Sequence, residues 1–288
     1  MLSYVVSKDL SKPVLWLNFD ETAVARSPEA LRGCVVSRKE WKGQVKGPHR
    51  KVRKDRQRGK YTYCATICDN SAVQAVLPQF LIGKSTHLPK KLVKAFHALP
   101  STQLQLLREK SSWVTSETML QMLKELKQAL LPFLRTMRPI LLLDCANAHL
   151  AKPVIQGAKK MGIQLLFIPA SATSLVQPAD VMVFAAFKVY LRKKYQEHRS
   201  TADEGQPAPL GWLWQLKESP REFFAARRWK KAFTSTGTSR KVSDLHSQLA
   251  NFMHDIDVCQ PSAKPTKAEV SRIWPAKRKM DFAYASLF

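Results

Sequence analysis

Apolar residues occur along the chain in short runs that end on polar residues, a pattern typical of buried strands. One run covers 14–20 and ends at Asp20, another covers 139–144 and ends abruptly on Asp144, and a third covers 163–168. A short helical pattern at 152–161 separates the last two runs and is closed by Gly162. Apolar runs alternating with a helix predict parallel strands that are buried on both faces.

The segment before this region has the composition of antiparallel strands. Residues 61–68 are rich in β-forming side chains, a turn follows at 69–71, and 73–82 is predicted as the next strand, although Pro78 interrupts it. Residues 33–37 are a further candidate for an edge strand, and 84–110 is expected to be loosely helical. These elements predict an antiparallel meander.

Two longer helices follow from capping and periodicity. Thr115 or Ser116 can cap the first, whose apolar residues recur at three- and four-residue steps until Pro132 disturbs its end. Pro178 suits the first position of the second, which runs to about residue 198 and carries Asp180 in its first turn. An acid there also complements the helix dipole without any catalytic role.

Composition and length limit the class of protein. The 288 residues are 45% hydrophobic, enough for one sizeable core and a smaller attached unit. No apolar run approaches the roughly 18 residues of a membrane helix, and the N-terminus lacks the layout of a secretory signal. Five cysteines, an odd number without framework spacing, indicate reduced thiols inside a cell. Cys64 and Cys68 are expected in the core, with zinc binding as the weaker alternative.

The pattern divides the chain into four parts. We expect an α/β domain at 1–199, a linker rich in Pro and Gly at 200–211, a helical extension at 212–258 and a basic flexible tail at 259–288. The extension is rich in aromatic residues: Trp212, Trp214, Phe223, Phe224, Trp229 and Phe233.

The positive net charge of the chain predicts the chemical class of its binding partner. Lys and Arg number 47 against 22 Asp and Glu, which gives a formal charge of +25, so we expect a polyanion as partner, most simply a nucleic acid backbone, and charge alone does not distinguish DNA from RNA. The segment 46–60 concentrates this charge without apolar periodicity, and its cations are Lys46, Arg50, Lys51, Arg53, Lys54, Arg56, Arg58 and Lys60. They are candidates for phosphate contacts; a solvated tract or a nuclear import signal is the alternative.

Three acids are the candidate chemistry. Asp20 and Asp144 end buried strands, where an unpaired carboxylate is costly, and Asp180 opens a helix. Carboxylates from two strand ends and a helix can converge on a divalent cation. For Asp20 and Glu21 a turn or helix cap is the simpler alternative, and strand alternation places Glu21 on the opposite face from Asp20.

Three motifs carry a resemblance that covers about residues 13–240. They are Asn18-Phe-Asp20-Glu21-Thr22, Leu141-Leu-Leu-Asp144 with His149, and Pro169 to Lys188 with Gln177-Pro178-x-Asp180. The chain resembles the DDE superfamily endonuclease domain of pogo- and Tigger-like transposases, in the mariner-like superfamily, which includes domesticated relatives of the centromere protein B type. The resemblance implies a ribonuclease H-like (retroviral integrase-type) α/β fold, a mixed sheet flanked by helices with a small helical C-terminal extension.

The resemblance also implies the chemistry. Asp20 would bridge two Mg²⁺ (or Mn²⁺) ions about 3.5–4 Å apart, and Asp144 and Asp180 would each hold one of them during cleavage and transfer of DNA strands. His149 would touch the substrate or orient Asp144, unless its role is only structural, and Gln177 would cap or position the last helix. The expected partner is DNA, bound by one copy or by a homodimer in the nucleus, with no membrane and no small-molecule cofactor.

Departures from the family leave other functions open. Ala148 and Ala179 stand where relatives usually carry Ser and Leu, and only about a dozen residues precede the first strand, where relatives carry helix-turn-helix domains. We therefore expect a fragment, a truncated gene or a domain without its sequence reader. A domesticated DNA-binding protein without catalysis is one alternative, and a basic RNA-binding protein or ribonuclease of the same fold is another. Tryptophans, including Trp113, could stack on bases, although core packing is their usual role.

Overall fold

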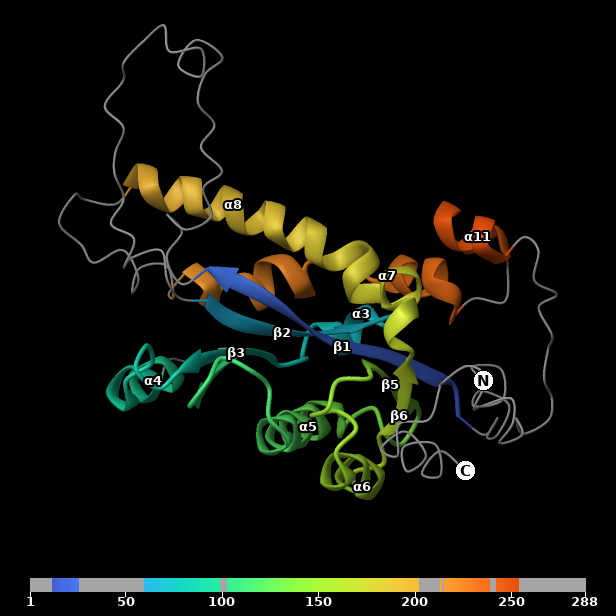
Figure 1. Ribbon diagram of the computed structural model, residues 1–288, viewed down its shortest axis with the longest axis horizontal. Helices are drawn as coiled ribbons and strands as arrows, with labels where there is room; N and C mark the ends of the chain where they lie inside the picture. The colour runs from blue at the N-terminus through green and yellow to red at the C-terminus, as the bar shows by residue number, and fades with distance from the viewer. Residues whose placement is uncertain are drawn as a thin grey trace, which may run out of the picture.

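The computed structural model describes residues 12–25, 60–98, 103–201, 213, 215–238 and 242–253 (Figure 1). Its centre is a six-stranded sheet with the order β4-β3-β2-β1-β5-β6. The strands are β1 (Val14–Ala25), β2 (Lys60–Cys68), β3 (Gln79–Lys84), β4 (Leu104–Glu109), β5 (Arg138–Asp144) and β6 (Gln164–Ile168). β1, β2 and β3 pair in antiparallel fashion, whereas β5 is parallel to β1 and β6 is parallel to β5.

This topology is the predicted ribonuclease H-like arrangement of an antiparallel meander followed by parallel strands, and the fold prediction is confirmed. β5 and β6 are joined by a crossover helix, as the two apolar runs predict, because parallel neighbours need a long connection. β4 extends the sheet at the far edge, parallel to β3.

Helices cover both faces of the sheet (Figure 1). One face carries α5 (Ser116–Leu130) and α6 (Lys152–Lys160), and the other carries α8 (Phe184–Thr201). Shorter helical segments are α3 (Ser71–Gln74), α4 (Lys90–His97), η2 (Ala170–Ala172), α7 (Thr173–Val176) and η3 (Ala179–Val183). The C-terminal segments are η4 (Pro220–Ala225), α10 (Lys230–Phe233), η5 (Thr234–Thr238), η6 (Val242–Asp244) and α11 (Ser247–Met253).

Alternation along β1 assigns its side chains to two separate cores. Leu15, Leu17 and Phe19 pack in the core under α5 and α6, whereas Trp16 and Val24 pack in the core under α8. The C-terminal helices contribute their aromatic residues to the α8 core, where Phe223 and Phe224 contact Phe187 of α8. The helical extension therefore shares a hydrophobic core with the sheet.

Three local predictions were wrong. The first strand continues to Ala25, because β2 pairs with it throughout from Leu17 to Ala25. The segment 73–78 is not strand: the side chain of Asn70 accepts hydrogen bonds from two backbone N–H groups and caps α3 there. The region 84–110 contains the edge strand β4 as well as a helix.

Several other predictions are confirmed. Cys64 and Cys68 are buried, Thr115 caps α5, and Gly162 ends α6 with a positive φ of 72°. Along the part of the chain that the structure describes, no helix is both long and apolar enough to cross a membrane. The segments 33–37 and 259–288 and most of the predicted linker lie outside the described residues.

Candidate active site

Sheet register brings the first two acids to the same end of neighbouring strands. Asn18 of β1 lies opposite Leu142 of β5, so Asp20 and Asp144 each stand two residues further along parallel strands. Two-residue steps also keep both acids on the sheet face that α8 covers, since Leu142 belongs to that core. Asp180 enters from η3, in the first turn of the helical segment that leads into α8.

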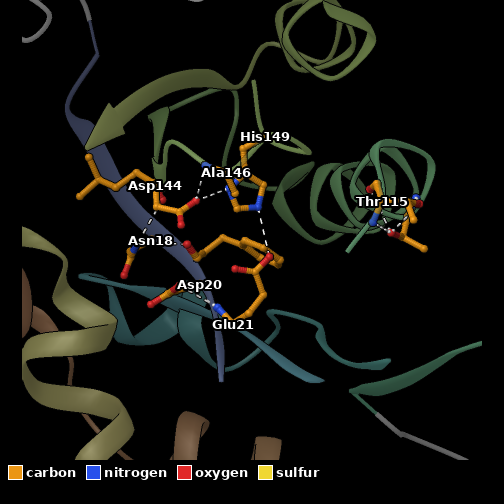
Figure 2. Close-up of polar contacts among 10 residues, drawn as sticks. Asn18, Asp20, Glu21, Thr115, Asp144, Ala146 and His149 are labelled. Carbon is orange, nitrogen blue, oxygen red and sulfur yellow. Dashed lines mark hydrogen bonds and ion pairs between the residues drawn. The ribbon is translucent and has the colours of Figure 1, made fainter. Parts of the chain in front are cut away.

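A single buried amide joins the three segments that carry these acids. The Nδ2 group of Asn18 donates a hydrogen bond of 3.0 Å to the carbonyl of Leu142, two residues before Asp144. Its Oδ1 atom accepts a hydrogen bond of 2.9 Å from the backbone N–H of Ala179, one residue before Asp180. Asn18 is fully buried, and Figure 2 shows it on β1 next to Asp144. This side chain therefore fixes where β1, β5 and η3 meet.

Asp20 is the most buried of the three acids, at 6% exposure. Its Oδ1 atom accepts the backbone N–H of Glu21 at 2.8 Å, whereas Oδ2 is buried and has no hydrogen-bond partner among the described residues. Burial, and then the negative charges of Asp180, Glu21 and Asp144, raise the pKa of Asp20 to about 8. A buried carboxylate with an orphaned oxygen is the kind of group that a cation would stabilise.

Asp144 has a different environment. Its Oδ1 atom accepts hydrogen bonds from Nδ1 of His149 at 2.6 Å and from the backbone N–H of Ala146 at 3.0 Å. Burial favours the neutral acid, but the hydrogen bond and charge of His149 and the Ala146 N–H outweigh it and lower the pKa of Asp144. One oxygen of Asp144 is thus held in place while the carboxylate stays ionised.

His149 is buried between two acids (Figure 2). Its Nε2 atom lies 3.2 Å from Oε1 of Glu21, and its ring packs edge-on against Phe19, with ring centroids 5.8 Å apart. Burial opposes protonation, but the hydrogen bonds and charges of Asp144 and Glu21 outweigh it and raise the pKa of His149 to about 10. The ring is therefore an imidazolium that donates to both carboxylates.

Asp180 faces solvent more than the other two acids do. Partial burial and the charge of Asp144 raise its pKa, and Lys188 on α8 offsets part of this effect. Because Asp180 contributes to the raised pKa of Asp20, and Asp144 to that of Asp180, the three carboxylates share one electrostatic environment. The positive charge of Lys188 offsets only part of the rise in the pKa of Asp180.

The donor set fits a hard divalent cation. Carboxylate oxygens are the ligands that Mg²⁺ prefers, and no hydrogen-bond donor among the described residues is assigned to the buried Oδ2 atom of Asp20, which interacts with the carboxyl group of Asp180. Within the described ranges, no group of three or more His, Cys, Asp or Glu side chains is already arranged as a metal-binding cluster.

The other predicted site residues have mixed outcomes. Gln177 is buried, and its backbone carbonyl accepts the N–H of Val181 in η3 at 3.0 Å, whereas its side-chain amide makes no hydrogen bond to the described part of the chain. Lys60 begins β2 and is exposed, while the other cations of the basic run lie outside the described residues. Trp229 is buried and Trp113 is exposed, and Trp212 and Trp214 lie outside the described residues.

The contacts that Glu21 and Asn18 make at this site were not predicted from the sequence. Glu21 does share the face of Phe19, as alternation predicts, but His149 connects it to Asp144 across the end of β5. Asn18 carried a signal that could have been used, because an amide inside an apolar strand must find hydrogen-bond partners. No signal in the sequence identifies those partners, which lie 124 and 161 residues away.

Comparison with known proteins gives one family and a set of structures. The model of the DDE superfamily endonuclease family matches residues 60–229, more than half of the chain. The Mos1 transposase paired-end complex with left transposon end is 18% identical, with 82% of this chain and 59% of that chain covered and a TM-score of 0.41. The catalytic domain of Mos1 mariner transposase is 16% identical, with 83% and 90% covered and a TM-score of 0.38. No curated protein matches.

Proposed function

Because the chain belongs to the DDE superfamily endonuclease family, we propose that it is a transposase-type endonuclease domain that cuts and transfers DNA strands with divalent metal ions. The observation that carries this proposal is the buried carboxylate of Asp20, whose Oδ2 atom has no partner among the described residues. An unpaired buried carboxyl oxygen costs stability, and a bound cation would remove that cost. The chain spans 59% of the length of the paired-end complex protein, so the proposal concerns this domain.

Asp20, Asp144 and Asp180 would hold the ions, which are Mg²⁺ or Mn²⁺. When bound, the ions supply activation of the attacking oxygen and stabilisation of the leaving oxygen in phosphodiester chemistry. Asp20 would contribute the buried oxygen, and Asp180 would contribute the carboxylate nearest to solvent. Asp144 contributes the oxygen that His149 does not hold.

Glu21 and His149 act on Asp144 and not on the substrate in this proposal. The imidazolium of His149 holds Oδ1 of Asp144 at 2.6 Å, and Glu21 holds the far side of the ring at 3.2 Å. Groups behind a ligand commonly orient it in this way. Asp144 therefore presents its second oxygen in a fixed direction.

Cleavage of supercoiled plasmid in the presence of Mg²⁺ or Mn²⁺ tests the proposal. Asp144→Asn keeps the shape of the side chain and removes one negative charge, so nicking should fall by orders of magnitude. Binding to DNA should persist, because it rests on Lys and Arg contacts to phosphate. Asp244→Asn is the matched control, since it makes the same change at an exposed carboxylate in η6.

The outcomes separate the candidate functions. A parent chain that nicks, with Asp144→Asn nicking equally well, contradicts the assignment of the acids. A chain that binds DNA but never nicks, with either metal ion, is instead the domesticated DNA-binding protein. Cleavage confined to RNA–DNA hybrids would indicate a ribonuclease of the same fold.

The basic run at 46–60 is proposed to supply phosphate contacts for this binding. Neutralising Arg50, Lys51, Arg53 and Lys54 together should weaken binding to all DNA sequences alike. The slope of log affinity against log salt should become shallower by about 0.9 for each phosphate that the variant no longer neutralises. Fluorescence anisotropy at several salt concentrations measures this slope, and an unchanged slope would leave the run as an import signal or a solvated tract.

A further inference from the structure

Asp180 has less regular backbone around it than the other two acids. Asp20 and Asp144 stand on strands of the sheet, whereas Asp180 belongs to a stretch built of three short helical segments, η2, α7 and η3. Helical segments of three to five residues are too short to be stable by themselves in water. The position of Asp180 therefore depends on the contacts that this stretch makes with other parts of the chain.

The stretch is held between the sheet and the helical extension. From the sheet, Oδ1 of Asn18 accepts the N–H of Ala179. From the other direction, α10 packs against η3, and both η5 and α11 pack against α7. Figure 1 shows α11 beside α7, although the two helices are far apart in the chain. Contacts from the extension are therefore candidates for holding Asp180 in place.

His246 reaches the stretch with its imidazole ring. Its Nε2–H group donates a hydrogen bond of 2.8 Å to the carbonyl oxygen of Leu175, five residues before Asp180. Its Nδ1 atom accepts the backbone N–H of Leu249 at 3.4 Å, so both ring nitrogens are engaged and the orientation of the ring is fixed. The end of a helix leaves carbonyl groups without partners, and the bond from His246 satisfies one of these groups at the end of α7.

Ser235 connects His246 to the other side of Asp180. Its backbone carbonyl accepts the N–H of His246 at 3.1 Å. Its hydroxyl lies 3.2 Å from Sδ of Met182, two residues after Asp180, in a weak hydrogen bond, because thioether sulfur is a poor acceptor. Ser235 is buried, so water does not compete for this contact. The extension therefore contacts the backbone before Asp180 and a side chain after it.

We propose that His246 is a positioning residue for Asp180, so that the helical extension sets where the third acid stands relative to the metal ions. His246 touches neither the carboxylate nor the substrate in this role, because its bond to Leu175 acts through the backbone of α7 and η3. A single anchor at Ala179 leaves the stretch free to rotate about it, and a second anchor removes that freedom. This inference rests on the proposed function, and it adds a role in metal binding for the extension.

Replacing His246 by leucine tests this role, because leucine is apolar and cannot donate the hydrogen bond. We expect His246→Leu to lower the affinity for Mn²⁺ by about 10- to 100-fold, the usual effect of removing a group that orients a metal ligand. Isothermal titration calorimetry without DNA measures this affinity. His246→Gln should restore most of it, since the glutamine amide can donate to the same carbonyl. His97→Leu is the matched control, because it removes a hydrogen bond between a histidine ring and the backbone of the edge strand β4.

A double-mutant cycle separates positioning from a general effect on folding. Asp180→Asn by itself should weaken the binding of Mn²⁺, and the binding that remains rests on Asp20 and Asp144. If His246 acts through Asp180, adding His246→Leu to Asp180→Asn should cause no further loss of affinity. Melting temperatures without metal show that each variant is folded under the conditions of the titration.

The outcomes keep this inference apart from the proposed function. A parent chain that binds neither Mn²⁺ nor Mg²⁺ overturns both. A parent that binds Mn²⁺, with His246→Leu binding it equally well, overturns the positioning role alone. Equal losses of affinity in His246→Leu and His97→Leu, or losses that add up in the double variant, would overturn it too and assign His246 to the stability of the fold.

Discussion

Replacing Asn18 by leucine tests whether one buried amide sets the positions of the three acids. Leucine has the same number and branching of side-chain heavy atoms and no polar atoms, so the change removes the hydrogen bonds, and its two methyl groups are larger than the amide atoms that they replace. Asn18 donates to the carbonyl of Leu142 and accepts from the N–H of Ala179, each within two residues of a candidate metal-binding acid. The substitution therefore acts on the geometry of the site without altering its carboxylates.

The expected cost follows from the groups left without partners. The N–H of Ala179 is buried at the start of η3, and losing its acceptor costs about 1–3 kcal/mol. The carbonyl of Leu142 loses one further hydrogen bond, worth about 1 kcal/mol. The free energy of unfolding should therefore fall by about 2–4 kcal/mol. A displacement of the acids by about 1 Å should lower the rate of cleavage by about 100-fold, while affinity for DNA stays near the parent value.

A second buried amide provides a matched control. Gln74 on α3 accepts from the N–H of Cys68 at 2.7 Å and donates to the carbonyl of Thr66 at 3.3 Å, so Gln74→Leu removes hydrogen bonds of the same kind. Urea unfolding should show comparable decreases of stability for Asn18→Leu and Gln74→Leu. Single-turnover cleavage under conditions where both variants are folded should be impaired only in Asn18→Leu. The rise in melting temperature on addition of Mn²⁺ should likewise be reduced only in Asn18→Leu.

Two results would refute this reasoning. Cleavage by Asn18→Leu at the parent rate would mean that the acids hold their positions without the amide. An equal decrease of cleavage in Gln74→Leu would mean that general stability, and not the position of the acids, limits the reaction.

Three further predictions concern other groups. Glu21→Gln, which keeps an oxygen but removes the charge facing His149, should lower cleavage about 10- to 100-fold, measured as rate against Mg²⁺ concentration, without weakening DNA binding. Asp20→Asn should raise the melting temperature in metal-free buffer, because it removes a buried and repelled carboxylate, and should abolish the further rise that Mg²⁺ produces. His97 accepts a hydrogen bond from the N–H of Leu106, and burial lowers the pKa of His97. The stability that His97 contributes is therefore complete above pH 6.5 and should decrease as the pH falls through its folded pKa. Urea unfolding of the parent chain and of His97→Gln between about pH 5 and 8 measures this difference.

Strands with strong apolar runs could be predicted from the sequence, because burial on both faces leaves a direct pattern. β5 and β6 are of this kind, and their boundaries differ from the predicted ones by a single residue. β4 was missed because Leu104–Glu109 alternates only briefly and is stabilised by pairing with β3, a contact that local pattern does not reveal. The segment at 73–78 was wrongly predicted as a strand, because the side chain of Asn70 caps α3 and stabilises a helical turn there.

Position along a strand could be predicted for the acids, but their partners could not. Asp20 and Asp144 were identified from the ends of apolar runs, and the register of β1 and β5 puts each of them two residues beyond the paired residues Asn18 and Leu142. The ionised state of Asp144 depends on His149, and the charge of His149 depends on Glu21, which lies 128 residues away in the chain. Such contacts arise only when the fold has brought separate segments together.

Alternation along β1 explains how one strand serves both sides of this site. Asn18 and Asp20 share the face toward α8, while Glu21 shares the opposite face with Phe19. Asp144 ends β5 and acts electrostatically on Asp20 on the first face. Its hydrogen bond with His149 also links it to Glu21 on the opposite face, because His149 contacts both acids at the end of β5. A shift of β1 by one residue would exchange these faces, placing Glu21 among the acids proposed to bind metal and removing the amide that contacts Leu142 and Ala179. The register of β1, which its pairing with β2 and β5 holds on both sides, is therefore as important to the proposed chemistry as the carboxylates themselves.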